Sequence, residues 1–189
     1  MPHDRCRPQP AADSIGPPAR GSVMTHLYFL RHGDADHPGK PTWKTDAERP
    51  LNPEGRRRMT AEARGMKALG ITIDAIVTSP YVRAAQTARC VASAYGLEER
   101  IVPSELLEPG GSFRDLEKAL RGTRGDAVLV VGHAPDLGLW AGHLVGADEI
   151  PLGKGWLAWV RLRAGEMRKG SARLMGLLPA EILAAAGRR

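Results

Sequence analysis

The stretch AVLVVGH, residues 127–133, combines an uninterrupted apolar run with a polar side chain at its end. Five consecutive apolar residues suit a central parallel strand that is covered on both faces. The stretch HLYFLRH, residues 26–32, has the same form, a short run of strand-forming residues that ends at a histidine. The two runs predict strands that deliver His133 and His32 to one edge of a sheet.

Strands and helices alternate along the rest of the chain. Asn52 and Pro53 begin a helix, because asparagine is favoured as an N-cap and proline at the first helical position, and Gly70 ends it. The remaining strands are expected at 75–79, 101–102, 156–162 and 171–177, and the remaining helices at 81–95, 112–120, 135–145 and 179–186. This alternation predicts an α/β fold. We expect a three-layer αβα sandwich, with helices on both sides of a mostly parallel central sheet and an antiparallel edge.

Length and composition favour one folded domain. The chain has 189 residues, of which 42% are hydrophobic and 25% charged, and this is ordinary for a globular domain. We expect residues 24–189 to form it. Residues 1–23 are rich in proline, arginine, alanine and serine and contain no apolar core of a secretory signal. They are expected to be a disordered extension, or to lie upstream of a true start at Met24.

Charge and cysteine content narrow the classes of partner. The net charge is +6, but residues 25–160 are neutral and the excess lies mainly in residues 161–189. A nucleic-acid-binding face would spread basic side chains among aromatic ones, so we expect no nucleic-acid partner. No apolar run reaches the ~18 residues of a membrane span, so no membrane partner is expected either. Two cysteines cannot make a disulfide framework, which fits a cytoplasmic compartment. The oligomeric state is open, and a monomer is favoured because no coiled-coil seam is present.

Arginines reinforce the two strand-end histidines. In open α/β sheets, ligands bind outside the carboxyl ends of the strands. Arg31 adjoins His32, and Arg83 lies at the start of the helix that follows strand 75–79. A guanidinium group is planar, always charged and able to bind phosphate through two nitrogens. Two arginines and two histidines at one edge therefore indicate a pocket for a dianionic phosphoryl group.

Four segments resemble motifs of the histidine phosphatase (phosphoglycerate mutase-like) superfamily. Residues 30–33, LRHG, resemble its RHG signature, and residues 49–55, RPLNPEG, resemble its RPLTxxG element. Residues 79–88, SPYVRAAQTA, are similar to its SPxxRAxxTA element, and residues 131–133, VGH, resemble the strand end that carries its second catalytic histidine. All four occur in the family's order, so the resemblance implies a phosphoglycerate mutase-like fold.

Within the superfamily the chain looks most like the short SixA-type phosphohistidine phosphatases. The features that carry this resemblance are the start RHGDAD, the small size and the lack of a large insertion between Arg83 and His133. The mutases and sugar phosphatases usually have RHGxxxxN, and this chain has Pro38 at the asparagine position. The expected substrate is phosphohistidine in a protein partner, with a small phosphate ester as the alternative.

The resemblance also implies a mechanism without metal or cofactor. His32 would take the phosphoryl group in a covalent intermediate, and water would then release phosphate. Arg31, Arg83 and His133 would bind the phosphoryl oxygens and neutralise the charge that develops on them.

The general acid and the role of one further carboxylate stay open. Many superfamily members carry an acidic residue in a loop after the helix of the second arginine. Glu108 occupies a matching place and is the expected catalytic acid, Glu105 is the near alternative, and SixA-type proteins often have no acid there. Asp34 is expected to face the pocket as a substrate-binding group, with a surface position or pairing with an arginine as the alternatives.

Two other functions compete with this interpretation. Residues 32–37, HGDADH, contain ligand types that hold divalent metals, so a metal-dependent hydrolase is one alternative. It leaves Arg31 and Arg83 unexplained, so no metal is expected. The other alternative is a phosphoryl-binding module without turnover, although nothing in the sequence argues for a loss of activity.

Overall fold

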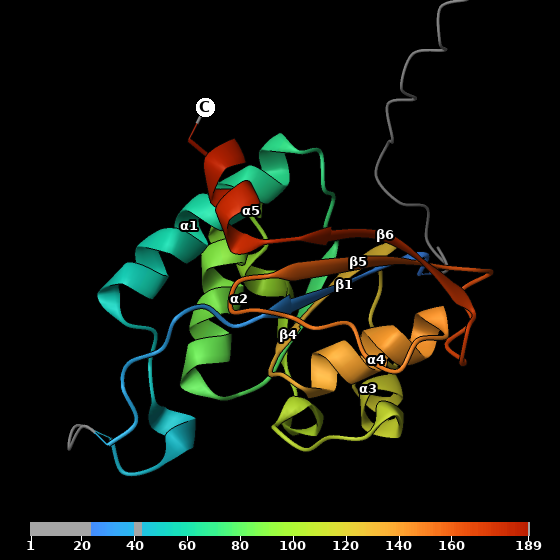
Figure 1. Cartoon of the computed structure of the whole chain (residues 1–189), viewed down its shortest axis with the longest axis horizontal. Helices are drawn as coiled ribbons and strands as arrows, with labels where there is room; N and C mark the ends of the chain where they lie inside the picture. Colours follow the sequence, from blue (N-terminus) through green and yellow to red (C-terminus); the bar gives the residue numbers. More distant parts are fainter. Residues whose placement is uncertain (1–23, 40–42, 189) are drawn as a thin grey trace, which may run out of the picture.

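A six-stranded mixed sheet forms the middle layer of the protein (Figure 1). The structure, a computed structural model, describes residues 24–39 and 43–188. The strand order across the sheet is β3-β2-β4-β1-β5-β6. The strands are β1 (His26–Arg31), β2 (Ala75–Thr78), β3 (Ile101–Pro103), β4 (Ala127–Gly132), β5 (Leu157–Leu162) and β6 (Ala172–Leu178). Strands β3, β2, β4 and β1 are parallel, and β5 and β6 are antiparallel additions beside β1.

Helices cover both faces of this sheet (Figure 1). One face carries α1 (Pro53–Ala68), α2 (Val82–Tyr95) and α5 (Ala180–Ala186), and the other carries α3 (Phe113–Ala119) and α4 (Asp136–Val145). Three 3₁₀ turns complete the elements: η1 (Asp46–Glu48), η2 (Glu98–Arg100) and η3 (Glu105–Leu107). The three layers, the mostly parallel sheet and its antiparallel edge confirm the predicted fold.

The pleat of the central strands divides the apolar side chains between two cores. In β4, Val128 and Val130 enter the core beneath α3 and α4, whereas Leu129 and Val131 enter the core beneath α1 and α2. All four are fully buried. Successive side chains of a strand point to opposite faces, so a strand between two helical layers must be apolar throughout. This is the physical reason for the uninterrupted run at 127–131.

The expected elements are all present, with shifts of one or two residues at their ends. The expected extension, residues 1–23, lies outside the described residues. The helices of the part that is described include none long and apolar enough to cross a membrane.

Candidate active site

Two adjacent parallel strands bring the two histidines together at their carboxyl ends. Arg31 of β1 lies opposite Gly132 of β4, so His32 and His133 leave the sheet at the same level. The backbone N–H of His32 donates to the carbonyl of Gly132 at 3.1 Å. The two imidazole rings meet edge to face with their centroids 5.3 Å apart. The register of the sheet therefore creates the pair.

Hydrogen bonds determine the tautomer of His32. Its Nδ1 lies 2.8 Å from the carbonyl oxygen of Gly33, which can only accept, so Nδ1 carries the proton. Its Nε2 lies 3.2 Å from Nε of Arg83, which can only donate, so Nε2 presents a lone pair. The ring is 7% exposed, and burial is the main cause that lowers its pKa to about 4, with Arg83 and Arg31 adding to the effect. His32 is thus a neutral imidazole whose nucleophilic nitrogen faces a guanidinium group.

Arg83 is held from two sides at the beginning of α2. Its side chain is nearly fully buried, with Nε on His32. Nη1 donates to the carbonyl oxygen of Asp46 at 2.7 Å, and Nη2 donates to the Asp46 carboxylate at 2.8 Å. The guanidinium also lies over the ring of Tyr81, 5.0 Å from its centroid, an arrangement that favours a cation. These contacts fix the plane of the guanidinium beside His32.

His133 lies between His32 and Tyr81, and its Nδ1 has no partner. Nε2 is 2.9 Å from Oγ of Ser79, the residue that follows β2. Nδ1 is buried and unbonded among the described residues. Burial, followed by the charges of His32 and Arg83, lowers the pKa of His133 to about 3. When Ser79 donates its hydroxyl proton to Nε2, Nδ1 carries a proton that only a ligand can accept.

Arg31 carries the second unsatisfied hydrogen-bond donor of the site. Its Nη1 donates to the carbonyl oxygen of Leu152 at 2.8 Å, while its Nε is buried and unbonded within the described part of the chain. The backbone N–H of Gly155 in the same loop lies 3.1 Å from the carbonyl oxygen of Arg31 and 3.3 Å from that of His32. Unsatisfied buried polar atoms are rare in folded proteins, and here two of them belong to the chain neighbour and the ring neighbour of His32.

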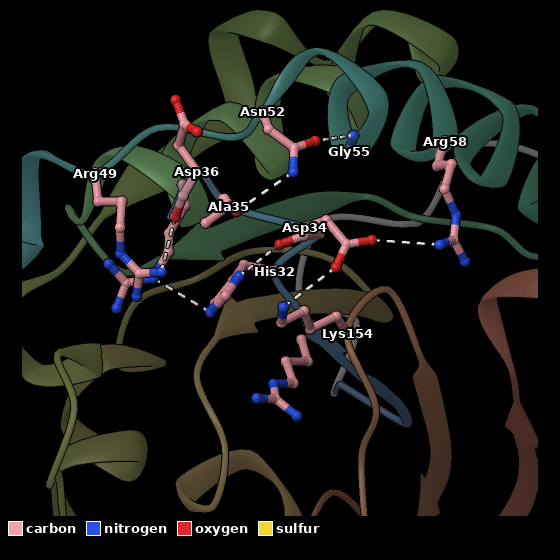
Figure 2. A network of polar contacts seen from close by, with 12 residues as sticks. His32, Asp34, Ala35, Asp36, Arg49, Asn52, Gly55, Arg58 and Lys154 are labelled. Atoms are coloured by element: carbon pink, nitrogen blue, oxygen red, sulfur yellow. Dashed lines mark hydrogen bonds and ion pairs between the residues drawn. The ribbon is translucent and has the colours of Figure 1, made fainter. Parts of the chain in front are cut away.

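Asp34 forms ion pairs with two cations (Figure 2), and its negative charge also acts to raise the pKa of Arg31. Its carboxylate pairs with Arg58 of α1 at 3.3 Å and with Lys154 at 3.2 Å. Arg58 also faces Glu62 at 3.9 Å and Glu181 at 3.4 Å. The structure contains the pairing of Asp34 with an arginine, and its role in substrate binding stays a prediction.

The RPLNPEG segment supports the loop that follows His32. Asn52 caps α1 through its side chain, which accepts from the N–H of Gly55 at 2.6 Å and donates to the carbonyl of Ala35 at 3.4 Å (Figure 2). Gly55 lies directly against the carbonyl of Asp34, where a Cβ atom would clash. The asparagine and the glycine of this motif therefore hold the catalytic loop against the helix.

The two candidate acids follow β3 at the same edge of the sheet, where Glu105 is the first residue of η3 and Glu108 comes directly after it. Glu108 is half-buried and Glu105 is exposed. Among the described residues, no hydrogen bond or ion pair joins either carboxylate to His32, Arg83 or His133. The neighbouring Gly110 is tied to the buried Asp136 by a bond of 2.8 Å, which anchors this loop to α4.

The residues of HGDADH diverge instead of forming a ligand set. His32 faces Arg83, Asp34 pairs with Arg58, and His37 is exposed with Nδ1 on the carbonyl of Pro38. In the part of the chain that is described, no three histidine, cysteine, aspartate or glutamate side chains are grouped to hold a metal ion. The described residues of HGDADH therefore do not share one ligand site.

Sequence reasoning missed three polar residues of the site. Ser79 and Thr87 stand inside the SPxxRAxxTA element, which offered a signal for both: Ser79 contacts His133, and Thr87 accepts from the N–H of Gly33 at 3.2 Å. Asp46 stands three residues before the RPLNPEG segment, and no pattern in the sequence marked it as a partner of Arg83.

A neutral histidine beside two arginines and a second histidine, at the carboxyl edge of a parallel sheet, defines a phosphoryl-transfer class of site. Comparisons with known proteins agree. The model of the Histidine phosphatase superfamily (branch 1) matches residues 27–109. An uncharacterized protein of Picosynechococcus sp. is 39% identical over 119 residues, which cover 61% of this chain and 70% of that protein.

Solved structures share the fold. The protein histidine phosphatase SixA, in a complex with tungstate, superimposes with a TM-score of 0.71 at 24% identity and covers 84% of this chain and 99% of its own. A phosphoserine phosphatase mutant of Entamoeba histolytica in complex with phosphoserine gives 0.63 at 15% identity, covering 85% and 100%. A mycobacterial glucosyl-3-phosphoglycerate phosphatase gives 0.58 at 17% identity, covering 80% and 97%. The chain belongs to the histidine phosphatase superfamily, and its general activity is that of a phosphatase.

Proposed function

We propose that this chain hydrolyses phosphohistidine carried by a protein partner, through a phosphoryl intermediate on His32. The observation that carries the proposal is the state of His32, a buried neutral imidazole whose Nε2 lone pair faces Nε of Arg83 at 3.2 Å. A nucleophile must be unprotonated at the working pH, and a pKa of about 4 meets that condition at neutrality.

The reaction proceeds in two displacements. First, Nε2 of His32 forms a bond to phosphorus while the bond from phosphorus to the substrate imidazole breaks. The substrate ring carries a proton on its other nitrogen, so it leaves as neutral imidazole. Water then attacks phosphorus, which releases inorganic phosphate and restores His32. Arg83 and the unsatisfied donors of Arg31 and His133 bind the phosphoryl oxygens, where charge increases in each transition state.

Two features favour a phosphoryl group presented by a protein. Imidazole is a better leaving group than an alkoxide, so the first step needs no strong general acid, which agrees with the lack of a contact from Glu108 or Glu105 to His32. The connection from β4 to α4 has only three residues, 133–135, so this connection contributes no lid over His133.

The test is phosphate release from a phosphohistidine-bearing protein in excess EDTA. We expect release by the wild type and by His37→Ala, an exposed histidine of the same loop, and none by His32→Ala. A phosphoenzyme that is labile to acid and stable to base should form only in the proteins that retain His32. Release by His32→Ala would refute the proposal. If the protein hydrolysed small phosphate esters but not phosphohistidine, the substrate would be a small ester. Activity that requires added metal would instead favour a metal-dependent hydrolase that uses the HGDADH residues.

A further inference from the structure

A groove of about 380 Å³ runs between α1 and α2, outside the catalytic site. The two helices lie side by side on one face of the sheet (Figure 1). Arg56, Thr60 and Arg64 recur every four residues along α1, and Gln86, Arg89 and Ser93 recur at three and four residues along α2. Residues spaced in this way share one side of a helix, so two polar stripes face each other across the groove.

The guanidinium groups of this groove have no carboxylate partner. Within the described residues, no ion pair involves Arg56, Arg64 or Arg89, and no acidic residue lines the groove. Other arginines of α1 are paired: Arg57 with Glu54, and Arg58 with Asp34 and Glu181. The arginines on the other sides of α1 are therefore paired, whereas two arginines of α1 and one of α2 leave three like charges around the groove.

Unpaired like charges around one hollow repel each other and create a positive potential there. An anionic ligand would relieve this repulsion. The arginine side chains are exposed, so binding them does not require the desolvation that makes buried ion pairs costly. Charge complementarity thus specifies the sign of the ligand.

The groove begins at the catalytic loop. Gln86, which lines it, accepts a hydrogen bond from the backbone N–H of Leu51 at 2.8 Å, and its neighbour Thr87 binds the N–H of Gly33. Gln86 is also one helical turn beyond Arg83. The groove extends from there along the helices for ~10 Å, because seven residues separate Gln86 from Ser93 at 1.5 Å each. A segment of roughly three extended residues would span it.

We propose that this groove, lined by Arg56, Arg64 and Arg89, is a docking site for an acidic peptide segment of the phosphorylated protein substrate. This docking site rests on the proposed function, because the acidic segment is part of the phosphorylated protein that the enzyme would hydrolyse. An acidic segment of three residues offers one carboxylate for each guanidinium, and its attachment would hold the phosphoryl group near His32. The groove would raise affinity for protein substrates and leave the chemical step untouched.

The experiment measures binding and turnover separately. The binding probe is a fluorescein-labelled hexaglutamate peptide, followed by fluorescence anisotropy at low salt. We expect the triple variant R56Q/R64Q/R89Q to bind the peptide at least ~10-fold more weakly than the wild type, because it lacks the charges that complement the peptide. We expect its KM for a phosphorylated acidic protein to rise in parallel, with kcat and the KM for p-nitrophenyl phosphate unchanged.

A matched control uses a second basic hollow at the other end of the sheet. Arg161, Arg163 and Arg173 are exposed and line that hollow, so R161Q/R163Q/R173Q removes the same charge far from the groove. We expect this variant to bind the peptide as the wild type does. If the triple variant loses its thermal unfolding transition, the single variant R89Q replaces it. We expect R89Q to weaken peptide binding in the same direction but by a smaller factor.

Three results would overturn the docking site. They are no peptide binding by the wild type, equal loss in both triple variants, and displacement of the peptide by hexauridylate at lower concentration than by unlabelled peptide, which would assign the groove to nucleic acid. Failure of the phosphatase proposal has a different signature: peptide binding still depends on the groove arginines, but no phosphohistidine is hydrolysed.

Discussion

Asp46 accepts two hydrogen bonds from the guanidinium of Arg83, through its carbonyl oxygen 2.7 Å from Nη1 and its carboxylate 2.8 Å from Nη2. Burial acts to raise the pKa of Asp46, but the hydrogen bond and charge of Arg83 outweigh it, so the pKa lies below its usual value. The carboxylate is therefore ionised and occupies the edge of the guanidinium that a phosphoryl oxygen would use. Asp46 orients Arg83, and in the proposed mechanism it would compete with the phosphoryl group for the same guanidinium nitrogens.

Asp46→Asn should strengthen anion binding. The amide keeps an oxygen acceptor for Nη2 but removes a negative charge next to the incoming dianion. We expect the inhibition constant of inorganic phosphate to fall about tenfold, as expected for one charge at close range near a protein surface. Product inhibition at constant pH and ionic strength measures it. Weaker inhibition would mean that orienting Arg83 is the larger effect of the carboxylate.

Arg83→Lys and Arg31→Ala should each lower kcat/KM by about 100-fold or more, because each removes donors to the oxygens on which charge develops. Lysine keeps the charge of Arg83 but cannot hold His32 and Asp46 at once through a planar group. Arg57→Ala is the control, since Arg57 is exposed and paired only with Glu54. Losses below tenfold would place both arginines outside the phosphoryl site.

The two site histidines should titrate well below the usual value of 6.5, His32 near 4 and His133 near 3. Between pH 6.5 and about 4 the unfolded chain binds protons that the folded protein does not, so the free energy of unfolding should fall as the pH is lowered through this window. NMR titration of the imidazole carbons, assigned with His32→Ala and His133→Ala, gives the midpoints. A midpoint near 6.5 for His32 would contradict its burial as a neutral nucleophile.

Glu62 should produce the opposite pH dependence. It is buried in α1 with Oε2 unbonded among the described residues, and burial raises its pKa to about 8 from a usual 4.5. The folded protein then retains a proton that the unfolded chain loses, so this contribution to stability should disappear as the pH rises from 4.5 to 8. Glu62→Gln, measured by urea unfolding at pH 5 and pH 8, should abolish this loss. The exposed Glu54→Gln should leave it unchanged.

Gly55→Ala should destabilise the protein by about 1–3 kcal/mol, the usual cost of forcing an extra carbon into a packed site. The added Cβ would clash with the carbonyl of Asp34 and push the catalytic loop away from α1. Gly176→Ala in β6 is the control, because a Cβ there meets nothing within 4 Å. Thermal unfolding of both variants tests the prediction. Equal melting temperatures would show that the loop after His32 moves to accept the Cβ atom without a loss of stability.

Much of this protein could be predicted from local patterns. The apolar runs at 26–30 and 127–131 predicted buried parallel strands, because only a strand covered on both faces needs apolar side chains at every position. Asn52 and Pro53 marked the beginning of α1, where the Asn52 side chain binds the N–H of Gly55. The positions of Arg31, His32, Arg83 and His133 followed from the rule that strand ends converge at one edge.

The partners of these residues could not be predicted in the same way. Asp46 lies 37 residues from Arg83, and Ser79 lies 54 residues from His133, so each contact depends on loops that meet only after the sheet has formed. Asp34 directly follows Gly33, yet its carboxylate pairs with Arg58 and Lys154, which lie far from it in the sequence.

The sequence by itself determined which side chains arrive at the carboxyl edge, because the period of a strand and the caps of a helix act over a few residues. Only the tertiary structure decided the chemical state of those side chains. Burial and the choice of hydrogen-bond partner set the tautomer and the low pKa of His32, and both depend on Gly33, Arg83 and the surrounding layers at once. The same packing left Nε of Arg31 and Nδ1 of His133 without hydrogen-bond partners in the part of the chain that the structure describes, and the proposed mechanism assigns both to the phosphoryl oxygens.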